Sequence, residues 1–434
     1  MTKQSIGIGL LGLGIIAGQV AKVLLEKADL LAEQVGCPVI LRKIKVLPAH
    51  LGKNPARRLP PELLTTDEDQ FFADPSIDIV VEAIGGENPA LEYLQRAISS
   101  GKHLVTANKE VIAKHGAALK TLARQYGVGL RYEGSVGGGI PLIAPFKYDL
   151  VANEIKGIFA IINGTTNYIL TRMSREGIDF PTALKSAQEL GYAEANPVND
   201  IEGIDANYKL AILSSLAFQT DVRPEDIHRE GISRISRRDF QYARELGYAI
   251  KLLAIAKQID DSIEVRVHPA LIPEDSFLAK VDGVYNAILV EGDLAGKVLF
   301  FGEGAGALAT SSAVIADVIS SARDIVLGIS DRAAVKLDSE KNIIPMADIE
   351  TQYYLRINVS DQPGVLARIS TVFGDHLISI SSVLQKEVDE ETQTAEVVIM
   401  THPAREKAMQ QTLQKLERLD VVKEISNFIR VETD

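Results

Sequence analysis

Apolar residues in the first third of the chain form short continuous runs, separated by stretches with a helical period. Ser5–Leu11 and Ile77–Ile84 are runs of the kind that a parallel sheet buries on both faces. Ile15–Leu30, Pro89–Ser100 and Val111–Gln125 place apolar side chains three and four residues apart, which is typical of helices that cover such a sheet. The alternation predicts a doubly wound α/β sheet. Its remaining strands are expected at Val39–Leu47, His103–Thr106 and Leu130–Tyr132.

The middle of the chain has a mixed pattern, which predicts an α+β domain that carries the substrate. Its longest apolar stretch, Ile204–Gln219, is expected to be a buried helix. Tyr242–Gln258 fits either a helix or a strand. Leu299–Gly306 and the apolar helix Ser312–Ser321 are expected to return the chain to the first domain. The other elements expected here are strands at Ile155–Asn163, Ile263–Pro269 and Tyr285–Val290, and helices at Thr166–Arg175 and Pro181–Leu190.

The C-terminal part of the chain has six further elements in the order β-α-β-β-α-β, which predicts a ferredoxin-like sandwich. They are expected at Tyr353–Val359, Val365–Gly374, Ile378–Lys386, Ala395–Thr401, Glu406–Arg418 and Val421–Val431.

These patterns predict three domains. The first is a dinucleotide-binding type of sheet domain at 1–135, to which a segment at about 307–336 returns. The second, 136–306, is expected to bind the substrate, catalyse and dimerise. A polar linker at 337–350 then leads to the sandwich at 351–434.

Charge and cysteine content narrow the classes of partner. The 434 residues include 46 Lys+Arg and 58 Asp+Glu, which gives a formal net charge of −12. This leaves no basic excess to neutralise phosphates, which argues against nucleic acid and against an anionic membrane. The single cysteine, Cys37, cannot form an intrachain disulfide, and no apolar run reaches the roughly 18 residues of a membrane span. We therefore expect a cytoplasmic protein that acts on a small molecule.

A glycine motif follows the first predicted strand and begins the first predicted helix. Gly12 allows a tight turn, Gly14 lets the backbone approach a pyrophosphate, and Ala17 lets the helix pack on the strand. The helix N-terminus adds unpaired N–H groups and a partial positive charge. The motif, Gly12-Leu13-Gly14-Ile15-Ile16-Ala17, matches G-x-G-x-x-A. It predicts a Rossmann-like dinucleotide site, with a purely structural turn as the alternative.

The choice between NADP and NAD depends on the end of the second strand. NAD enzymes usually carry an acidic residue there, which binds the ribose 2′-hydroxyl, and Val46–His50 contains none. Lys53, Arg57 and Arg58 follow and are suited to a 2′-phosphate. We expect a preference for NADP, with a solvated basic loop as the alternative.

Two charged residues interrupt the apolar helix predicted in the middle domain. Asp205 and Lys209 are four residues apart, so they share one face, in line with Ile212 and Leu216. A buried lysine is rare unless it is paired or functional. The pair is therefore a candidate for chemistry, with a structural ion pair as the alternative.

Hydride transfer would require a proton donor that these residues can provide. Reducing a carbonyl leaves an alkoxide that needs a proton, and the reverse reaction needs a base at the hydroxyl. A free lysine has a pKa of about 10.4, so its neighbours must shift it. Lys109 ends a predicted strand, where open α/β sheets bind ligands, and its proximity to Lys209 would lower both pKa values. A lone surface lysine is the alternative for Lys109.

Several motifs in a fixed order resemble the homoserine dehydrogenase family over essentially the whole chain. Ala187–Lys209 is similar to the family signature, A-x3-G-aromatic-small followed by N/D-P-x2-D-x2-G-x-D-x3-K. Asn196 stands where that signature often has Asp. Asn163–Leu170 (NGTTNYIL), Thr106–Glu110 (TANKE) and Ile84–Ala90 (IGG-x-x-PA) resemble its other hallmarks.

The resemblance implies reversible, nicotinamide-dependent interconversion of L-aspartate 4-semialdehyde and L-homoserine, on the route to threonine, isoleucine and methionine. It implies that Lys209 is the general acid and base, assisted by Lys109. Glu194 would hold the α-amino group of the substrate, and Asp205 would orient the hydroxyl or aldehyde end. Thr165, Tyr192 and Asp200 would line the pocket. The implied contacts of NADP or NAD are Gly12, Gly14, Ile15, Ile16, Ala17, Gly85, Thr106, Lys109, Gly191 and Gly304.

The stretch Glu133–Ile140 (EGSVGGGI) is similar to the sodium loop of that family. The resemblance implies that oxygens at Glu133, Val136, Gly138 and Ile140 bind sodium or another monovalent cation, and carbonyl oxygens suit a hard cation. A flexible interdomain hinge is the alternative. The seven histidines show no ligand spacing, so we expect no transition-metal site.

The C-terminal sandwich resembles an ACT domain, with D-x-P-G-V-L at its first strand–helix junction. This turn places backbone N–H groups at a helix start, where they suit a carboxylate. The resemblance implies an amino-acid effector, for which we expect L-threonine, and a homodimer or homotetramer. A domain that only dimerises is the alternative. The candidate effector residues are Asp361, Gly364, Val365, Leu366 and Ile380.

Three other functions compete with this interpretation. Aspartate-semialdehyde dehydrogenase would need a catalytic cysteine, and Cys37 precedes the second strand, away from the ligand edge. An enzyme like phosphoglycerate dehydrogenase would need a catalytic histidine, and no signature surrounds any of the seven. A non-enzymatic amino-acid sensor would not need Lys109, Lys209 and Asp205.

Overall fold

The computed structural model describes residues 3–51, 59–329, 341–389 and 391–433. The chain divides into two compact units, which are described separately. Unit 1 consists of Met1–Ile155, Tyr208–Pro224 and Glu291–Glu340, and unit 2 consists of Lys156–Asn207, Glu225–Val290 and Lys341–Asp434.

Unit 1 contains the predicted parallel sheet. In the described residues its strand order is β3-β2-β1-β4-β5-β6, so the order reverses between β1 and β4, as in a Rossmann-like fold. Strand β4 is shorter than the predicted Ile77–Ile84, because the Glu82 carboxylate turns back to accept the Ile84 N–H. The strands are β1 (Ile6–Leu11), β2 (Val39–Lys45), β3 (Leu64–Thr65), β4 (Ile79–Glu82), β5 (His103–Thr106) and β6 (Leu130–Arg131).

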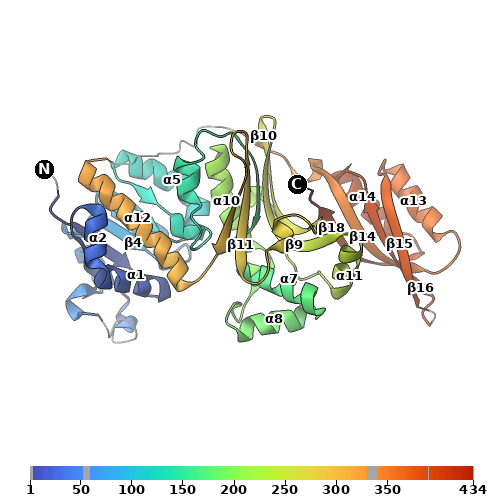
Figure 1. Cartoon of the computed structure of the whole chain (residues 1–434), viewed down its shortest axis with the longest axis horizontal. Coiled ribbons are helices and arrows are strands. Elements are labelled where there is room, and N and C mark those ends of the chain that lie inside the picture. Colours follow the sequence, from blue (N-terminus) through green and yellow to red (C-terminus); the bar gives the residue numbers. More distant parts are fainter. Residues whose placement is uncertain (1–2, 52–58, 330–340, 390, 434) are drawn as a thin grey trace. The chain divides into compact units, whose positions relative to one another are not determined.

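Helices cover this sheet, and one of them arrives from late in the sequence. Helix α12 (Ala307–Leu327) is longer than the predicted Ser312–Ser321 and contacts α1, α2, β4 and β5 (Figure 1). Its Val314 and Val318 are part of the hydrophobic core of this unit. The single helix predicted at Ile15–Leu30 is two helices, because Lys27 leaves helical geometry between them. The other helices and strands are α1 (Ile15–Glu26), α2 (Ala28–Val35), α3 (Glu68–Ala73), α4 (Ala90–Ser99), α5 (Lys109–Gln125), α6 (Ile143–Tyr148) and β12 (Gly296–Glu303).

Unit 2 begins with an antiparallel sheet and the helices around it. The ambiguous stretch Tyr242–Gln258 contains both elements: α11 ends at Glu245, and β9 begins at Tyr248 after Gly247, whose φ is +81°. Helix α10 (Ile204–Phe218) continues from unit 2 into unit 1. The elements are β7 (Ile155–Ile161), α7 (Gly164–Glu176), α8 (Phe180–Glu189), α9 (Val198–Ile201), β8 (His228–Arg229), α11 (Arg237–Glu245), β9 (Tyr248–Ile259), β10 (Ser262–Pro273) and β11 (Tyr285–Gly292).

The C-terminal elements form the predicted sandwich. Its strands are ordered β18-β14-β16-β15, all antiparallel, and α13 contacts α14 (Figure 1). The ferredoxin-like prediction is confirmed. The elements are β13 (Asn342–Ile343), β14 (Glu350–Ser360), α13 (Val365–Asp375), β15 (Ile380–Asp389), β16 (Thr394–Thr401), β17 (Ala404–Arg405), α14 (Glu406–Leu416) and β18 (Val422–Val431).

Some of the strand pairings were not predicted. Strand β18 pairs in parallel with β10, with Ala270 opposite Arg430 and Leu271 opposite Val431. The sheet of the sandwich therefore continues into the sheet of the middle domain. In the segment expected to be a linker, β13 pairs with β10 through Asn342 and Ile343.

A buried ionic network lies along this joint. Arg266 on β10 donates to Glu432 just beyond β18, and Lys257 donates to the same carboxylate at 2.8 Å. His268 accepts from Arg266 Nε at 2.9 Å. Arg430 donates to Glu406 through two nitrogens, at 2.6 and 2.9 Å. The joint thus depends on the contacts of the Glu432 and Glu406 carboxylates with these cations and on the acceptor nitrogen of His268.

Acid is expected to weaken this joint. Burial and the neighbouring Arg430 and Arg266 lower the pKa of His268 to about 3. Burial alone would raise the pKa of Glu432, but Arg266 and Lys257 lower it to about 2. In both cases the unfolded chain binds protons that the folded chain does not. The free energy of unfolding therefore decreases as the pH is lowered. For His268 the loss begins below about pH 6.5, and for Glu432 it begins below about pH 4.5.

Urea unfolding at a series of pH values measures this loss. We expect His268 to contribute a decrease of about 2 kcal/mol between about pH 6.5 and 5. His268→Gln keeps an acceptor for Arg266 and should remove that part of the pH dependence. An unchanged slope in this variant would show that other groups carry it.

Of the described helices, none is both long enough and apolar enough to cross a membrane.

Candidate functional site

The glycine turn predicted after β1 has the required geometry. Gly12 has φ +88° and donates its N–H to the Lys45 carbonyl at 3.0 Å. A side chain at Gly12 would lie 3.1 Å from Ile84, whereas one at Gly14 would meet no atom within 4 Å. Ala17 is buried against the sheet, as expected. The backbone at Gly14 therefore borders open space.

The start of α1 can accept an anion. Gly14 is its N-cap residue, and among the described residues no side chain caps the helix and no acid lies in its first turn. Ile15 is 82% exposed, and Ile16 is partly buried against the core. The free N–H groups and the helix dipole suit a pyrophosphate, so this chain fits the dinucleotide that its motif predicts.

Several hydrogen bonds connect the carboxyl ends of β4 and β5 and form a hydrogen-bonded group there. The Thr106 hydroxyl donates to Glu82 at 2.5 Å and accepts from the Asn108 N–H at 3.0 Å. The Asn108 amide donates to the Gly86 carbonyl at 2.7 Å. Gly85, with φ +82°, has open space where a side chain would project.

This group also positions Lys109. Asn108 is the N-cap residue of α5 and accepts the Val111 N–H at 3.2 Å, which makes Lys109 the first residue of the helix. Lys109 is half-buried. It lies at the carboxyl edge of the sheet, as the sequence predicts, next to the turn that contains Gly85.

The glycine loop after β6 is anchored by its first residue. The Glu133 carboxylate accepts the N–H groups of Leu142, Ile143 and Ala144, at 2.6 to 2.8 Å, at the start of α6. Since its side chain is used there, the backbone carbonyl is the oxygen of Glu133 better placed for a cation. Among the described residues no group of three or more His, Cys, Asp or Glu could hold a metal.

The same loop lies against the segment that contains Gly304. The Gly139 N–H donates to the Glu303 carbonyl at 3.2 Å. A side chain at Gly138 would lie 2.7 Å from the Gly304 carbonyl carbon, and φ of Gly138 is +55°. Two backbones approach so closely that only glycine fits. Val136 and Ile140, the other predicted cation positions, are buried.

In unit 2, Asn163 joins two of the predicted substrate residues. Its amide donates to Asp200 at 2.7 Å and to Asp205 at 2.9 Å. Its side-chain oxygen accepts the Thr166 N–H at 2.9 Å and so caps α7. Sequence reasoning assigned no role to Asn163, although it is the first residue of the NGTTNYIL motif. A motif that begins with a helix-capping asparagine was the available signal.

The other predicted substrate residues lie around the start of α7 and in the loop after α8. Thr165 donates to the Tyr192 carbonyl at 2.7 Å, and the Tyr192 ring packs on Tyr168 at 5.0 Å. Tyr192 and Glu194 are exposed. Gly191 has φ +76° with open space around it.

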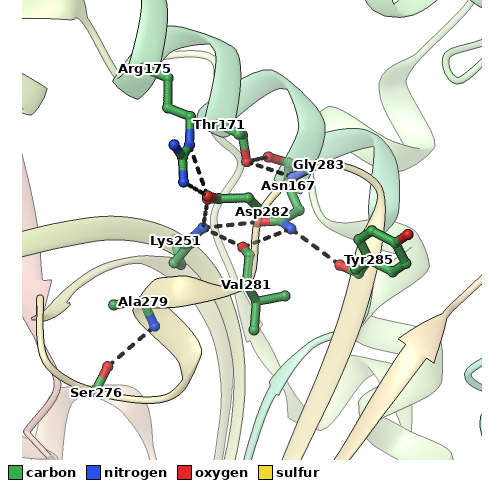
Figure 2. Close-up of polar contacts among 10 residues, drawn as sticks. All are labelled: Asn167, Thr171, Arg175, Lys251, Ser276, Ala279, Val281, Asp282, Gly283 and Tyr285. Carbon is green, nitrogen blue, oxygen red and sulfur yellow. Dashed lines mark hydrogen bonds and ion pairs between the residues drawn. The ribbon is translucent and has the colours of Figure 1, made fainter.

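A second group of residues that the sequence did not reveal supports α7 (Figure 2). Asn167 donates to the carbonyls of Val281 and Tyr285, at 3.1 and 3.2 Å. The buried Lys251 donates to the Val281 carbonyl at 2.5 Å and to Asp282 at 3.3 Å. Burial lowers the pKa of Lys251. Because these contacts fix the start of α7, they also fix the Asn163 bridge.

Asp205 and Lys209 lie in the first two turns of α10. They are 4% and 7% exposed, so the pair is buried, as the apolar pattern predicts. Because the two residues are four positions apart, both side chains lie on one face of the helix.

Two further sequence expectations concern cofactor choice and cysteine chemistry. Lys53, Arg57 and Arg58 lie outside the described residues. Cys37 precedes β2 and packs against the core at the amino end of the strand. Open parallel sheets bind ligands at the other edge, so a thioester role for Cys37 has no support.

The ACT-type turn has its expected shape. Gly364 is the N-cap residue of α13, with φ +91° and open space where a side chain would project. Val365 is buried, Leu366 is exposed, and Ile380 packs partly into the sandwich core. The Asp361 N–H donates to the Gln393 carbonyl at 2.9 Å, which continues the pairing of β14 with β16 up to the turn.

Comparison with known proteins identifies three family models. Residues 12–133 match "Homoserine dehydrogenase, NAD binding domain", residues 141–319 match "Homoserine dehydrogenase", and residues 353–421 match "ACT domain". The chain is 42% identical to the homoserine dehydrogenase of Neisseria gonorrhoeae, with 99% of each chain covered.

Solved structures agree with these matches. The crystal structure of a homoserine dehydrogenase from Thiobacillus denitrificans is 42% identical, covers 100% of both chains and has a TM-score of 0.93. A hyperthermophilic archaeal homoserine dehydrogenase in complex with NADPH is 26% identical, has a TM-score of 0.62 and covers 73% of this chain and 97% of its own.

Proposed function

The chain belongs to the homoserine dehydrogenase family of NAD(P)-dependent oxidoreductases, and from this premise we propose how its residues divide the work of the reaction. The reaction proposed is the reversible reduction of L-aspartate 4-semialdehyde to L-homoserine, on the route to threonine, isoleucine and methionine. The observation that supports it best is the Asn163 bridge, because it brings Asp200 together with Asp205 in the first turn of the helix that carries Lys209.

The dinucleotide would lie along the carboxyl edge of the sheet in unit 1. When bound, it supplies or accepts the hydride. Gly12, Gly14 and the first N–H groups of α1 would hold the pyrophosphate. The other proposed contacts are Ile15, Ile16, Ala17, Gly85, Thr106, Lys109, Gly191 and Gly304. We propose NADP as the preferred form, a preference supported by Lys53, Arg57 and Arg58 and by the NADPH complex of the archaeal relative.

The substrate is an amino acid, and the charges of unit 2 suit it. Glu194 would bind the α-ammonium group, and Asp205 would orient the hydroxyl or aldehyde end. Thr165, Tyr192 and Asp200 would complete the pocket.

Lys209 would move the proton. In the reduction, its ammonium group donates to the oxygen that becomes the homoserine hydroxyl. In the oxidation, the neutral amine takes that proton back. Asp205, one helical turn earlier, offers a carboxylate that balances the buried ammonium, and Lys109 would assist from the edge of the sheet.

We also propose an amino-acid effector, L-threonine, at the ACT turn, and a homodimer or homotetramer. Gly364 and the start of α13 suit a carboxylate, and β15 is the terminal strand of its sheet, with Val383 and Leu366 exposed nearby. A sodium or other monovalent cation would bind the loop from Glu133 to Ile140. The lone cysteine favours a cytoplasmic location.

Homoserine-dependent reduction of NADP and of NAD tests the function in one assay. We expect turnover with both, a higher kcat/KM with NADP, and inhibition by millimolar L-threonine in the wild type. Asp361→Ala should reduce the inhibition and leave uninhibited turnover unchanged. An absence of turnover with both dinucleotides would contradict the proposed dehydrogenase activity. A higher kcat/KM with NAD would contradict the proposed preference for NADP. Full activity at all threonine concentrations would contradict the proposal that L-threonine is the effector.

Replacing Asn163 by serine is expected to raise the KM for L-homoserine about tenfold and to leave the KM for the dinucleotide unchanged. Serine still caps α7, so the helix should remain, but it cannot donate to two carboxylates at once. Steady-state kinetics with each substrate varied in turn measures the effect. Asp179→Ala, which removes the exposed cap of α8, is the matched control. Equal KM changes for both substrates would mean that Asn163 only supports the fold.

A further inference from the structure

A hollow lies within unit 2, apart from the Asn163 group. It has a volume of about 540 Å³ and lies between the loop before α11, helix α14 and strand β18. One wall belongs to the middle domain and includes Glu202, Glu230 and Arg234. The other belongs to the sandwich and includes Leu413, Glu417 and Phe428.

The lining combines charge of both signs with an apolar wall. Glu230 is held by Arg430 at 2.9 Å and by His228 at 2.8 Å, and Glu202 accepts from Ser233 at 2.7 Å. Arg234 and Glu417 are exposed at the rim. Carboxylates outnumber the guanidinium, so a simple anion is disfavoured. A small molecule with an ammonium group, a carboxylate and an aliphatic part matches all three features.

The pocket wall touches the turn between the two predicted substrate carboxylates. The Ile232 N–H donates to the Ile201 carbonyl at 2.8 Å, and Arg229 donates to the Glu202 carbonyl. A side chain at Gly231 would lie 2.5 Å from the Ile201 carbonyl oxygen, so no gap separates the two segments.

This turn is short. The turn at 201–203 consists of Ile201, the last residue of α9, and the two residues that lead to α10, which begins at Ile204 just before Asp205. Glu202 therefore faces the pocket only two residues from Asp200, and Asn163 links Asp200 to Asp205. A displacement of Glu202 would therefore shift the carboxylates of both Asp200 and Asp205.

We propose that this pocket is a second effector site, which binds a free α-amino acid and alters substrate affinity through the turn at 201–203. Arg234 binds the carboxylate of the ligand, Glu417 and Glu202 bind its ammonium group, and Leu413 and Phe428 contact its side chain. The site differs from the ACT turn at Gly364, which lies at the start of α13, a helix that contributes no residue to this pocket.

The sequence contains no tryptophan, so Phe428→Trp places a single fluorescent reporter in the pocket. The twenty L-amino acids are titrated one at a time against this full-length variant, which also carries Gly364→Val to block the ACT turn. We expect at least one to change the tryptophan emission at millimolar concentration. The same amino acid should change the KM for L-homoserine of the Gly364→Val protein at least twofold. No change in emission with any amino acid overturns the site.

Three variants separate the ligand contact from the coupling. Arg234→Ala should weaken binding at least tenfold, whereas Arg223→Ala, an exposed arginine in unit 1, should not. Ser233→Ala loses the bond to Glu202 and should bind the amino acid but lose its effect on KM. Binding that survives Arg234→Ala overturns the assigned contact. A KM effect that survives Ser233→Ala overturns the route. Turnover without effector is measured throughout, so a failure of the proposed dehydrogenase function is seen separately.

Discussion

Replacing Lys209 by alanine is expected to lower kcat for homoserine oxidation about a thousandfold. The alkoxide or hydroxyl oxygen then has no group that exchanges a proton with it at the buried face of α10. Binding should change little, because the substrate carboxylates and the dinucleotide cradle remain. The measurement is steady-state kinetics in both directions, with a pH profile of kcat. The profile of the variant should lose the ionisation that the wild type shows.

Ser214→Ala is the matched control for Lys209. Ser214 lies on the same helix, is 0% exposed, and its hydroxyl has no hydrogen-bond partner among the described residues. Its removal should leave kcat within about twofold of the wild type. A Lys209→Ala enzyme with full turnover and an unaltered pH profile would exclude this lysine as the proton carrier.

Removing the carboxylate of Asp239 is expected to have the largest effect on folding, a loss of about 3–5 kcal/mol in the free energy of unfolding. Asp239 is 0% exposed and accepts from Arg356 at 2.9 Å and from Asn427 at 2.8 Å. It also forms the capping box of α11 with Ser236. Asp239→Ala leaves the Arg356 guanidinium buried without this partner, and breaks the cap as well.

Urea unfolding followed by far-UV circular dichroism measures this loss. The double variant Asp239→Ala/Arg356→Met should recover part of the stability, because it removes the buried guanidinium, whose remaining ion partner would be Glu396. Asp179→Ala, which removes an exposed helix cap, should cost only about 1 kcal/mol. If Asp239→Ala costs no more than Asp179→Ala, the buried pair contributes little to folding.

Local patterns predicted most of the architecture. The parallel strands were recognisable because strands buried on both faces are apolar throughout, and the helices between them keep a 3.6-residue period. The boundaries of β5 were predicted as observed, whereas the break at Lys27 was not, because nothing in its neighbourhood differs from a continuous helix.

Long-range features were harder to predict. The β10–β18 pairing depends on residues about 160 positions apart, such as Ala270 and Arg430, and no local pattern specifies such a partner. The buried pair at Asp205 and Lys209 was visible because charge interrupts an apolar stripe. Asn163 was not, since a neutral amide in a turn carries no such contrast. The roles assigned to all these residues stay predictions.

The shared backbone ladder between β10 and β18 has a consequence for anyone who trims the chain. A version cut before β14 would leave the edge of β10 open at Ala270 and Leu271, and Arg266 would lose Glu432. An open edge favours self-association. The buried Arg266 guanidinium would also lose one of its carboxylate partners and keep Glu264, which weakens the remaining fold. The C-terminal segment therefore cannot be removed without consequence. We expect the truncated protein to precipitate unless the exposed edge of β10 is redesigned.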